Sequence, residues 1–263
     1  MIRITSVQVG KPQTMPAGHV EPTNLATYHG PWDQGVQDNA VGDHRIEDHG
    51  VEDHRGRRDA NEAPLTWTSA IVKKSVHTRL WLGKENLVGD AQADLKNHGG
   101  PDKAVLGYSL EHYNQWREEL GRPMLPGSFG ENFTITGMNE DSVCVGDRFR
   151  IGTAVVEVSQ PRQPCWKLSR LWGIANLDEL VRQTGRTGWY FRVLEEGDVG
   201  VGDELVPLTL RRNEWTVRAV SDIMNDKSAP PTRVKALLDY EYLAEGWRDT
   251  PSRRWIASGR GEG

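Results

Sequence analysis

Apolar and polar residues alternate with a period of two over short segments, which are separated by turns rich in glycine and proline. This alternation is typical of β-strands with one buried and one exposed face. It predicts strands at Ile2–Val9, Trp67–Val76, Lys103–Tyr108, Asn132–Ile135, Arg148–Ile151, Ala154–Ser159, Tyr190–Leu194 and Glu204–Leu210. The main part of the chain is therefore expected to be mainly β.

A helical period interrupts the strands in two places. Apolar residues recur every three or four positions over Ser109–Leu120 and again over Leu177–Thr184, where a glycine follows. From about Glu214 onwards the spacing is helical throughout and predicts three short helices. We expect a main domain at 1–212 and a small three-helix C-terminal domain at 213–263.

The tripeptide Val-Gly-Asp occurs four times, beginning at Val41, Val88, Val145 and Val201. The last three fall between predicted strands, where a polar turn with glycine is expected. Their irregular spacing excludes a repeat architecture.

The segment from about 30 to 62 is rich in Asp, Gly, His, Asn and Arg and has almost no large apolar residues. Asp-His pairs begin at Asp43, Asp48 and Asp53, and such side chains are able to bind zinc. However, a spacing of five does not align residues on one helical face, and no cysteine joins them. A solvated insertion is the favoured interpretation, and a metal site is the alternative.

The chain of 263 residues has 32 basic and 37 acidic side chains, so its net charge of −5 gives no general attraction to nucleic acid or anionic lipid. No stretch approaches the ~18 consecutive apolar residues of a membrane span, and the N-terminus lacks a signal-peptide core. Two cysteines are too few for a disulfide framework. These features predict a cytoplasmic protein without a membrane partner.

Cys165 is the first candidate for chemistry. It lies between two prolines and a tryptophan, and Arg162 and Lys167 flank it with positive charge that favours the thiolate, a nucleophile and soft metal ligand. The alternative is an inert cysteine packed beside Trp166. Cys144 has apolar neighbours and is expected to be buried.

Three loops carry further candidate side chains. His98 and Lys103 flank a glycine pair, Glu131 and Asn132 follow a glycine-rich run, and Arg186 lies between two glycines. Glycine amides and cations suit an anion, although ordinary turns explain each loop equally well. Together they suggest a basic pocket formed by Lys73, His98, Lys103, Arg162, Lys167 and Arg186.

Four runs occurring in order resemble the YiiM-like branch of the MOSC (molybdenum cofactor sulfurase C-terminal) family: HGGPDKAVLGYSLEHY, GSFGENFTITG, VSQPRQPCWKL and TGRTGWYFRVLEEGDV. The resemblance covers roughly 1–9 and 66–210, and the tail resembles the three-helix domain that often follows. It implies a MOSC-type β-barrel with peripheral helices, closed or nearly closed, and a basic pocket for the molybdenum cofactor (molybdopterin). The segment at about 30–62 is longer and more acidic than the family's usual link.

The resemblance also implies a reaction. Cys165 takes the place of the family's cysteine, and by analogy with the mitochondrial amidoxime-reducing component its thiolate would bind molybdenum. The substrate would be an N-hydroxylated compound such as 6-N-hydroxylaminopurine, reduced from N–OH to N–H. The predicted cofactor contacts are Lys73, Lys103, Asn132, Arg162, Lys167 and Arg186. His98 is expected to position the substrate or deliver a proton.

The resemblance leaves partners and alternatives open. A flavin-containing reductase is the expected electron donor, with the helical tail as its docking surface, and a homodimer is possible. A carrier of molybdenum cofactor, or of sulfur as a Cys165 persulfide, is the alternative function. Acidic residues in the tail dilute its basic face and disfavour nucleic-acid binding.

Overall fold

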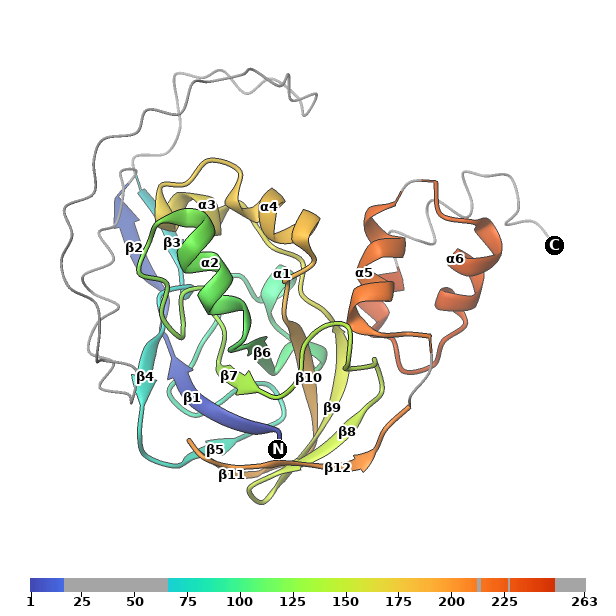
Figure 1. The fold of residues 1–263 in the computed structure, drawn as a ribbon. Helices are drawn as coiled ribbons and strands as arrows, with labels where there is room; N and C mark the ends of the chain where they lie inside the picture. The colour runs from blue at the N-terminus through green and yellow to red at the C-terminus, as the bar shows by residue number, and fades with distance from the viewer. Residues whose placement is uncertain (17–65, 212–213, 227, 249–263) are drawn as a thin grey trace.

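The structure is a computed structural model of the chain and describes residues 1–16, 66–211, 214–226 and 228–248. The predicted insertion at about 30–62 lies outside the described residues. A curved sheet forms the main body, helices cover one end of it, and further helices lie beside it (Figure 1).

The strands of the described residues are short, and most are antiparallel to their neighbours. They are β1 (Arg3–Val9), β2 (Gln13–Pro16), β3 (Thr66–Ser69), β4 (Lys74–Val76), β5 (Leu80–Leu82), β6 (Val105–Ser109), β7 (Phe133–Thr136), β8 (Arg148–Ile151), β9 (Ala154–Pro161), β10 (Trp189–Glu195), β11 (Gly197–Val199) and β12 (Leu205–Thr209). The helices are α1 (Leu95–His98), the 3-10 helix η2 (Pro101–Lys103), α2 (His112–Leu120), α3 (Lys167–Trp172), α4 (Leu177–Thr184), α5 (Val217–Asn225) and α6 (Pro231–Leu238).

Eight strands form the main sheet in the order β12-β8-β9-β10-β6-β7-β1-β4, in which only β6 and β7 are parallel. Its end strands are not joined by a strand ladder, so the expected closed barrel is not confirmed. Backbone hydrogen bonds nevertheless hold the turn before β12 against β1, from Ile4 N–H to the Asp203 carbonyl (2.9 Å) and from Leu205 N–H to the Ile2 carbonyl (3.0 Å). The strand predicted at Trp67–Val76 is wrong as one element, because residues 70–73 separate β3 from β4 and Lys73 turns inward.

The Val-Gly-Asp turns are confirmed where the structure describes them. Gly89, Gly146 and Gly202 have φ values of 93°, 88° and 89°, a region that favours glycine because it has no Cβ. The aspartate of the Val145 turn accepts a hydrogen bond from Cys144 N–H (2.9 Å), so the glycine and the carboxylate together fix the turn.

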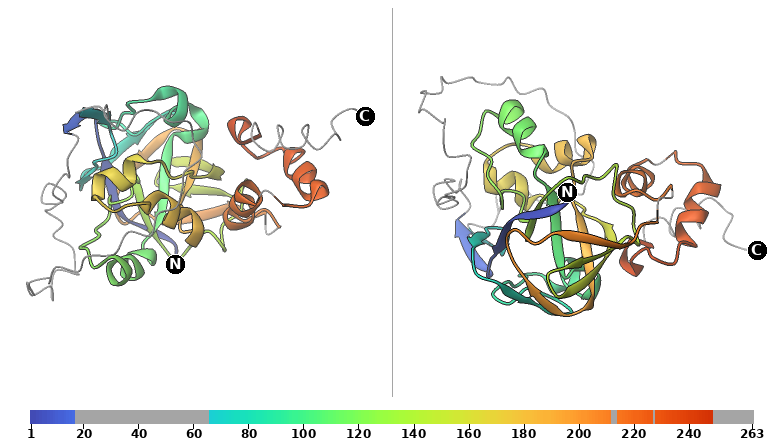
Figure 2. Two further views of the ribbon diagram at one scale, coloured as in Figure 1. Left: turned by 90° about the horizontal axis from the view of Figure 1, so that it is seen from above. Right: turned by 60° about the horizontal axis from the view of Figure 1, so that its bottom comes forward.

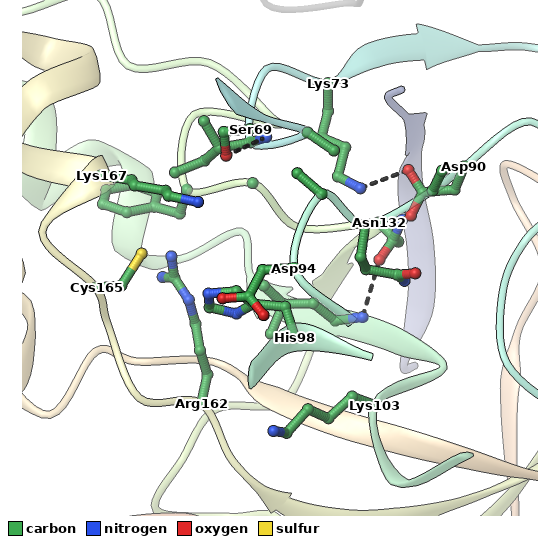
Figure 3. Close-up of a pocket in the computed structure, with 18 of the residues that line it drawn as sticks. Ser69, Lys73, Asp90, Asp94, His98, Lys103, Asn132, Arg162, Cys165 and Lys167 are labelled. Carbon is green, nitrogen blue, oxygen red and sulfur yellow. Dashed lines mark hydrogen bonds and ion pairs between the residues drawn. The ribbon is translucent and has the colours of Figure 1, made fainter. Parts of the chain in front are cut away.

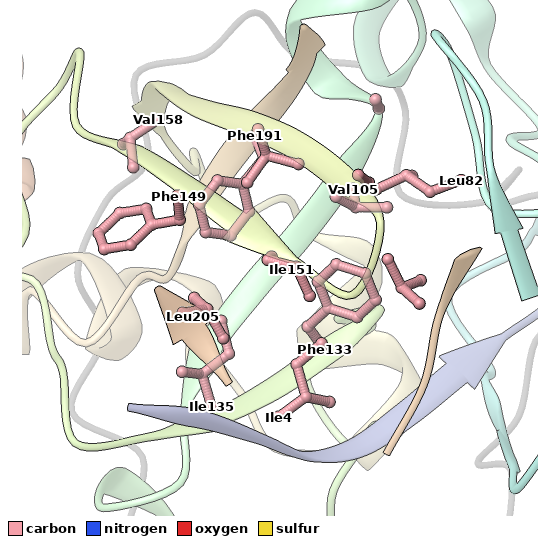
Figure 4. Close-up of a cluster of buried hydrophobic side chains, with 14 of the residues drawn as sticks. Ile4, Leu82, Val105, Phe133, Ile135, Phe149, Ile151, Val158, Phe191 and Leu205 are labelled. Carbon is pink, nitrogen blue, oxygen red and sulfur yellow. The ribbon is translucent and has the colours of Figure 1, made fainter. Parts of the chain in front are cut away.

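The main hydrophobic core lies inside the curve of the sheet (Figure 4). β10 shows the predicted alternation, with Trp189, Phe191 and Val193 buried and the residues between them less buried. β9 is buried at every position, because Ala154, Val156 and Val158 face the main core and helix α5 packs against the strand. A separate aromatic cluster fixes helices α2, α3 and α4 at the end of the sheet, where Tyr108 stacks on Phe129 with ring centroids 4.6 Å apart.

Helices α5 and α6 lie beside the sheet and have their own apolar cluster (Figure 2). The third predicted helix is a short helical segment at residues 245–248. The helices are tied to the sheet by the hydrogen bond from Ala244 N–H to the Ser159 carbonyl (3.1 Å). The domain boundary at 212 stays a prediction. Within the described residues, no helix combines the length and the apolar composition needed to cross a bilayer.

Candidate functional site

Segments far apart in the sequence meet around one open pocket, close to the aromatic cluster. They are the link between β3 and β4, the loop before α1, the glycine-rich loop before β7 and the segment between β9 and α3. Seven of the eight predicted site residues line it: Lys73, His98, Lys103, Asn132, Arg162, Cys165 and Lys167. Figure 3 shows the side chains of Cys165, Arg162, Lys167 and His98 directed into the same space.

Cys165 lies on the short connection between β9 and α3, where Pro161 and Pro164 restrict the backbone. Its thiol is partly buried and forms no disulfide. Among the described residues, no three His, Cys, Asp or Glu side chains are grouped to hold a metal ion. A metal at Cys165 therefore needs most of its ligands from another molecule.

Arg162 brings a buried positive charge into the pocket. The residue is only 6% exposed, and its Nη1 has no hydrogen-bond partner in the described part of the chain. A buried cation is costly unless an anion compensates it. The Arg162 guanidinium therefore marks the place where an anionic group is expected to bind.

His98 ends the short helix α1 and faces the pocket. Burial lowers the pKa of His98 below its usual value, and the carboxylate of Asp94 opposes this effect. Three cations of the pocket add to the lowering: Lys167, Arg162 and Lys103. The imidazole is therefore neutral at neutral pH, and once protonated it is a stronger acid than an ordinary histidine.

The sequence analysis missed Asp90, which organises one wall of the pocket. Its Oδ1 accepts hydrogen bonds from Lys73 Nζ (2.5 Å) and Gly10 N–H (2.7 Å), and its Oδ2 accepts one from Asn132 Nδ2 (2.8 Å). Burial lowers the pKa of Lys73, and Asp90 opposes this effect. In the sequence, Asp90 is visible only as the aspartate of the Val-Gly-Asp turn that begins at Val88. That motif predicts a turn and does not indicate a role in the pocket.

Asn132 was predicted to bind the cofactor, but its amide is occupied within the protein. Nδ2 donates to the Asp90 carboxylate and to the Gln8 carbonyl (3.2 Å), while Oδ1 accepts from Leu106 N–H (3.1 Å). Lys73 is held by Asp90 in the same way. Both residues line the pocket, but their polar groups are bonded to other parts of the protein and hold its wall in place.

Glu131, one of the candidate side chains of the glycine-rich loop, is fully buried and lies outside the pocket lining. Its carboxylate accepts hydrogen bonds from Gly127 N–H (2.7 Å) and Phe129 N–H (3.2 Å), and from the Tyr113 hydroxyl. The turn needs glycine because Gly127 and Gly130 have φ values of 95° and 77°. Glu131 therefore shapes the loop from within.

Arg186, the eighth predicted site residue, is not among the residues that line this pocket. Its guanidinium lies 3.6 Å from the ring centroid of Trp116 and donates to Glu119 (2.6 Å). The stacking and the ion pair hold Arg186 against α2. Its Nη1 is buried and has no hydrogen-bond partner in the described part of the chain, so its contact with the cofactor stays a prediction.

Lys103 and Lys167 complete the positive charge of the pocket. Lys103 ends η2 and is partly buried, and this burial lowers its pKa while Asp102 and Asp94 oppose the effect. Lys167 begins α3, and its Nζ donates to the Thr68 carbonyl (3.2 Å). With Arg162, these residues make a site suited to an anion beside a thiol.

Comparison with known proteins identifies similar chains. The MOSC domain model matches residues 94–206. The chain is 46% identical over 180 residues to the uncharacterized protein YflK of Bacillus subtilis, covering 68% of this chain and 81% of that protein. It is 36% identical to protein YiiM of Escherichia coli, covering 72% and 85%. A protein named reductase from Gibberella moniliformis is 34% identical, and the match spans 61% of this chain but only 29% of that protein.

Solved structures agree with these matches. The crystal structure of YiiM from Geobacillus stearothermophilus superposes with a TM-score of 0.68 at 29% identity, covering 97% of this chain and all of that one. The crystal structure of YiiM from Escherichia coli gives a TM-score of 0.63 at 31% identity, covering 70% and 88%.

Proposed function

The chain belongs to the MOSC family and is YiiM-like, and from this premise we propose that its pocket binds the molybdenum cofactor and reduces N-hydroxylated compounds. The observation that carries the proposal is the juxtaposition of the partly buried Cys165 thiol with the buried Arg162 guanidinium, whose Nη1 has no hydrogen-bond partner among the described residues. The first suits a soft metal and the second an anionic group, and one cofactor supplies both.

The residues present fit this cofactor. Cys165 would hold its metal as a soft thiolate ligand. Its phosphate needs cations in a partly desolvated place, which Arg162 supplies together with Lys103 and Lys167.

The wall of the pocket is built to remain in place when a ligand binds. Asp90 holds Lys73, Asn132 and the Gly10 backbone at once, so none of these side chains needs to reorient. Fixed groups lose little conformational entropy on binding. Lys73 and Asn132 therefore act mainly as positioning residues, whereas Arg162, Lys103 and Lys167 supply the direct attraction.

Reduction of an N–OH group to N–H takes two electrons and two protons, breaks the N–O bond and releases water. When bound, the cofactor supplies the two-electron redox chemistry, and a flavin-containing reductase is the proposed source of electrons. His98 is the group in this pocket suited to transfer protons: its neutral imidazole accepts one from solvent, and its lowered pKa favours release to the substrate.

The reaction is tested by anaerobic reduction of 6-N-hydroxylaminopurine with an artificial electron donor. The wild-type protein should form adenine, Cys165→Ala should lose this activity, and Cys144→Ala should keep it because Cys144 is buried outside the pocket. Molybdenum bound without turnover would instead favour the carrier function. Equal activity in the wild type and Cys165→Ala would contradict the role of the thiol.

A further inference from the structure

A second cavity borders the segment that carries Cys165 and is also lined by residues of the C-terminal helices. It has a volume of about 230 Å³ and opens to solvent. That space is sufficient for several water molecules or a small ion. The residues around it include Arg162, Arg182, Thr187, Ser221, Asn225 and Trp247.

The cavity is polar, unlike the apolar packing within the C-terminal helices. Ser221 and Asn225 lie one turn apart on α5 and so face the same side. Ser221 is 4% exposed, and its hydroxyl has no hydrogen-bond partner among the described residues. Arg162 lines this cavity as well as the first and also has an unpartnered buried nitrogen.

Unpartnered buried polar groups are uncommon in folded proteins, because each costs about 1–3 kcal/mol. Here two such groups come from separate parts of the fold, the end of β9 and the face of α5, and line one cavity. A ligand or ordered solvent that contacts both would relieve both costs.

The charges around the cavity indicate the sign of this ligand. Two arginines line it, and its lining contains no carboxylate. Arg182 is supported from its own helix by Glu179 and, at 3.9 Å, by Asp178. Neither acidic residue lines the cavity, so Arg182 keeps donors available on that side.

We propose that this cavity is a binding site for a small oxyanion, a phosphate or carboxylate group. The donors are the guanidinium of Arg182, the hydroxyl of Ser221, the amide of Asn225 and the free nitrogen of Arg162. Because Arg162 belongs to both cavities, the anion binds next to the Cys165 pocket. Its source is either free phosphate or the phosphate of a nucleotide whose base enters that pocket.

Titration calorimetry with inorganic phosphate tests the site without depending on reductase activity. Wild-type protein should bind phosphate, Arg182→Gln should weaken binding roughly tenfold or more, and Ser221→Ala should weaken it by a smaller factor. Arg233→Gln, which alters the exposed face of α6 away from both pockets, is the control and should bind phosphate like the wild type.

Folding does not confound this test, because the Ser221 hydroxyl has no partner to lose and its variant should keep the wild-type urea midpoint. Absence of phosphate binding would overturn the proposal. Binding that the Arg182 and Ser221 variants leave unchanged would also overturn it, because the phosphate would then be bound elsewhere.

The source of the anion is decided kinetically, and this step alone rests on the proposed reductase function. If the phosphate of a nucleotide binds here, Arg182→Gln should raise the KM of an N-hydroxylated nucleoside monophosphate and leave that of the free base unchanged. An equal KM ratio in variant and wild type would assign the site to a free anion.

Discussion

Asp90→Ala tests how the wall of the pocket is held. Lys73 and Asp90 form an ion pair of 2.5 Å whose side chains are 6% and 1% exposed. Removing the carboxylate leaves a buried ammonium without its counter-charge, takes the side-chain acceptor from Gly10 N–H and removes one of the two acceptors of Asn132 Nδ2. Breaking a buried pair from one side costs about 3–5 kcal/mol, and we expect a loss of free energy of unfolding in this range.

Urea denaturation at pH 7 measures the loss. Asp239→Ala is the matched control, because Lys235 and Asp239 form a pair of 2.8 Å whose side chains are 57% and 64% exposed. Such exposed pairs are worth about 0–1 kcal/mol. Lys73→Met added to Asp90→Ala should recover part of the stability, because it removes the unpaired charge.

The loss of stability in Asp90→Ala should also depend on pH. Burial lowers the pKa of Lys73 in the folded state, and without Asp90 that pKa falls further. Between the lowered pKa of Lys73 in the folded variant and its ordinary pKa in the unfolded chain, the unfolded chain binds more protons. The free energy of unfolding of Asp90→Ala should therefore rise as the pH rises above 7. A loss no larger than that of Asp239→Ala, with no recovery at alkaline pH, would refute this account of the wall.

Three further substitutions separate the roles of the pocket residues. His98→Gln should remove an ionisation below about 6.5 from the pH profile of kcat/KM, because burial and nearby cations lower the pKa of His98. An unchanged pH profile would exclude proton transfer by this residue. Arg162→Gln should leave the urea midpoint of cofactor-free protein unchanged or higher while lowering bound molybdenum, and the reverse pattern would mean that Arg162 is structural. Arg186→Ala should cost about 1–2 kcal/mol of stability through loss of its stacking on Trp116. Unchanged molybdenum content would assign Arg186 to packing, and loss of the metal would support the predicted cofactor contact.

The sequence predicted the longer elements well because their burial is regular. β10 alternates between more and less buried positions, and α4 buries one face, so each pattern is visible within the element itself. The elements that were missed, such as β5 and β11, have three residues each and exist because they pair with one another. A period cannot be detected over three residues, and that pairing joins positions more than a hundred residues apart.

The candidate site was predictable in its chemistry but not in its internal contacts. The charges around Cys165 were visible in the sequence, since Arg162 and Lys167 lie within three positions of it. The role of Asp90 depends on Lys73 and Asn132, which lie 17 and 42 positions away. The contacts of Arg186 were not predictable for the same reason, because Trp116 and Glu119 are distant in sequence and adjacent in space.

The molybdenum content of purified protein tests the central claim most directly. Wild type, Cys165→Ala and Cys144→Ala should be purified anaerobically from cells that make the cofactor and compared by elemental analysis. We predict about one molybdenum per chain in the wild type and in Cys144→Ala, because Cys144 lies outside the pocket, and little in Cys165→Ala. Equal metal in all three proteins, or none in the wild type, would contradict the assignment of Cys165 as the molybdenum ligand.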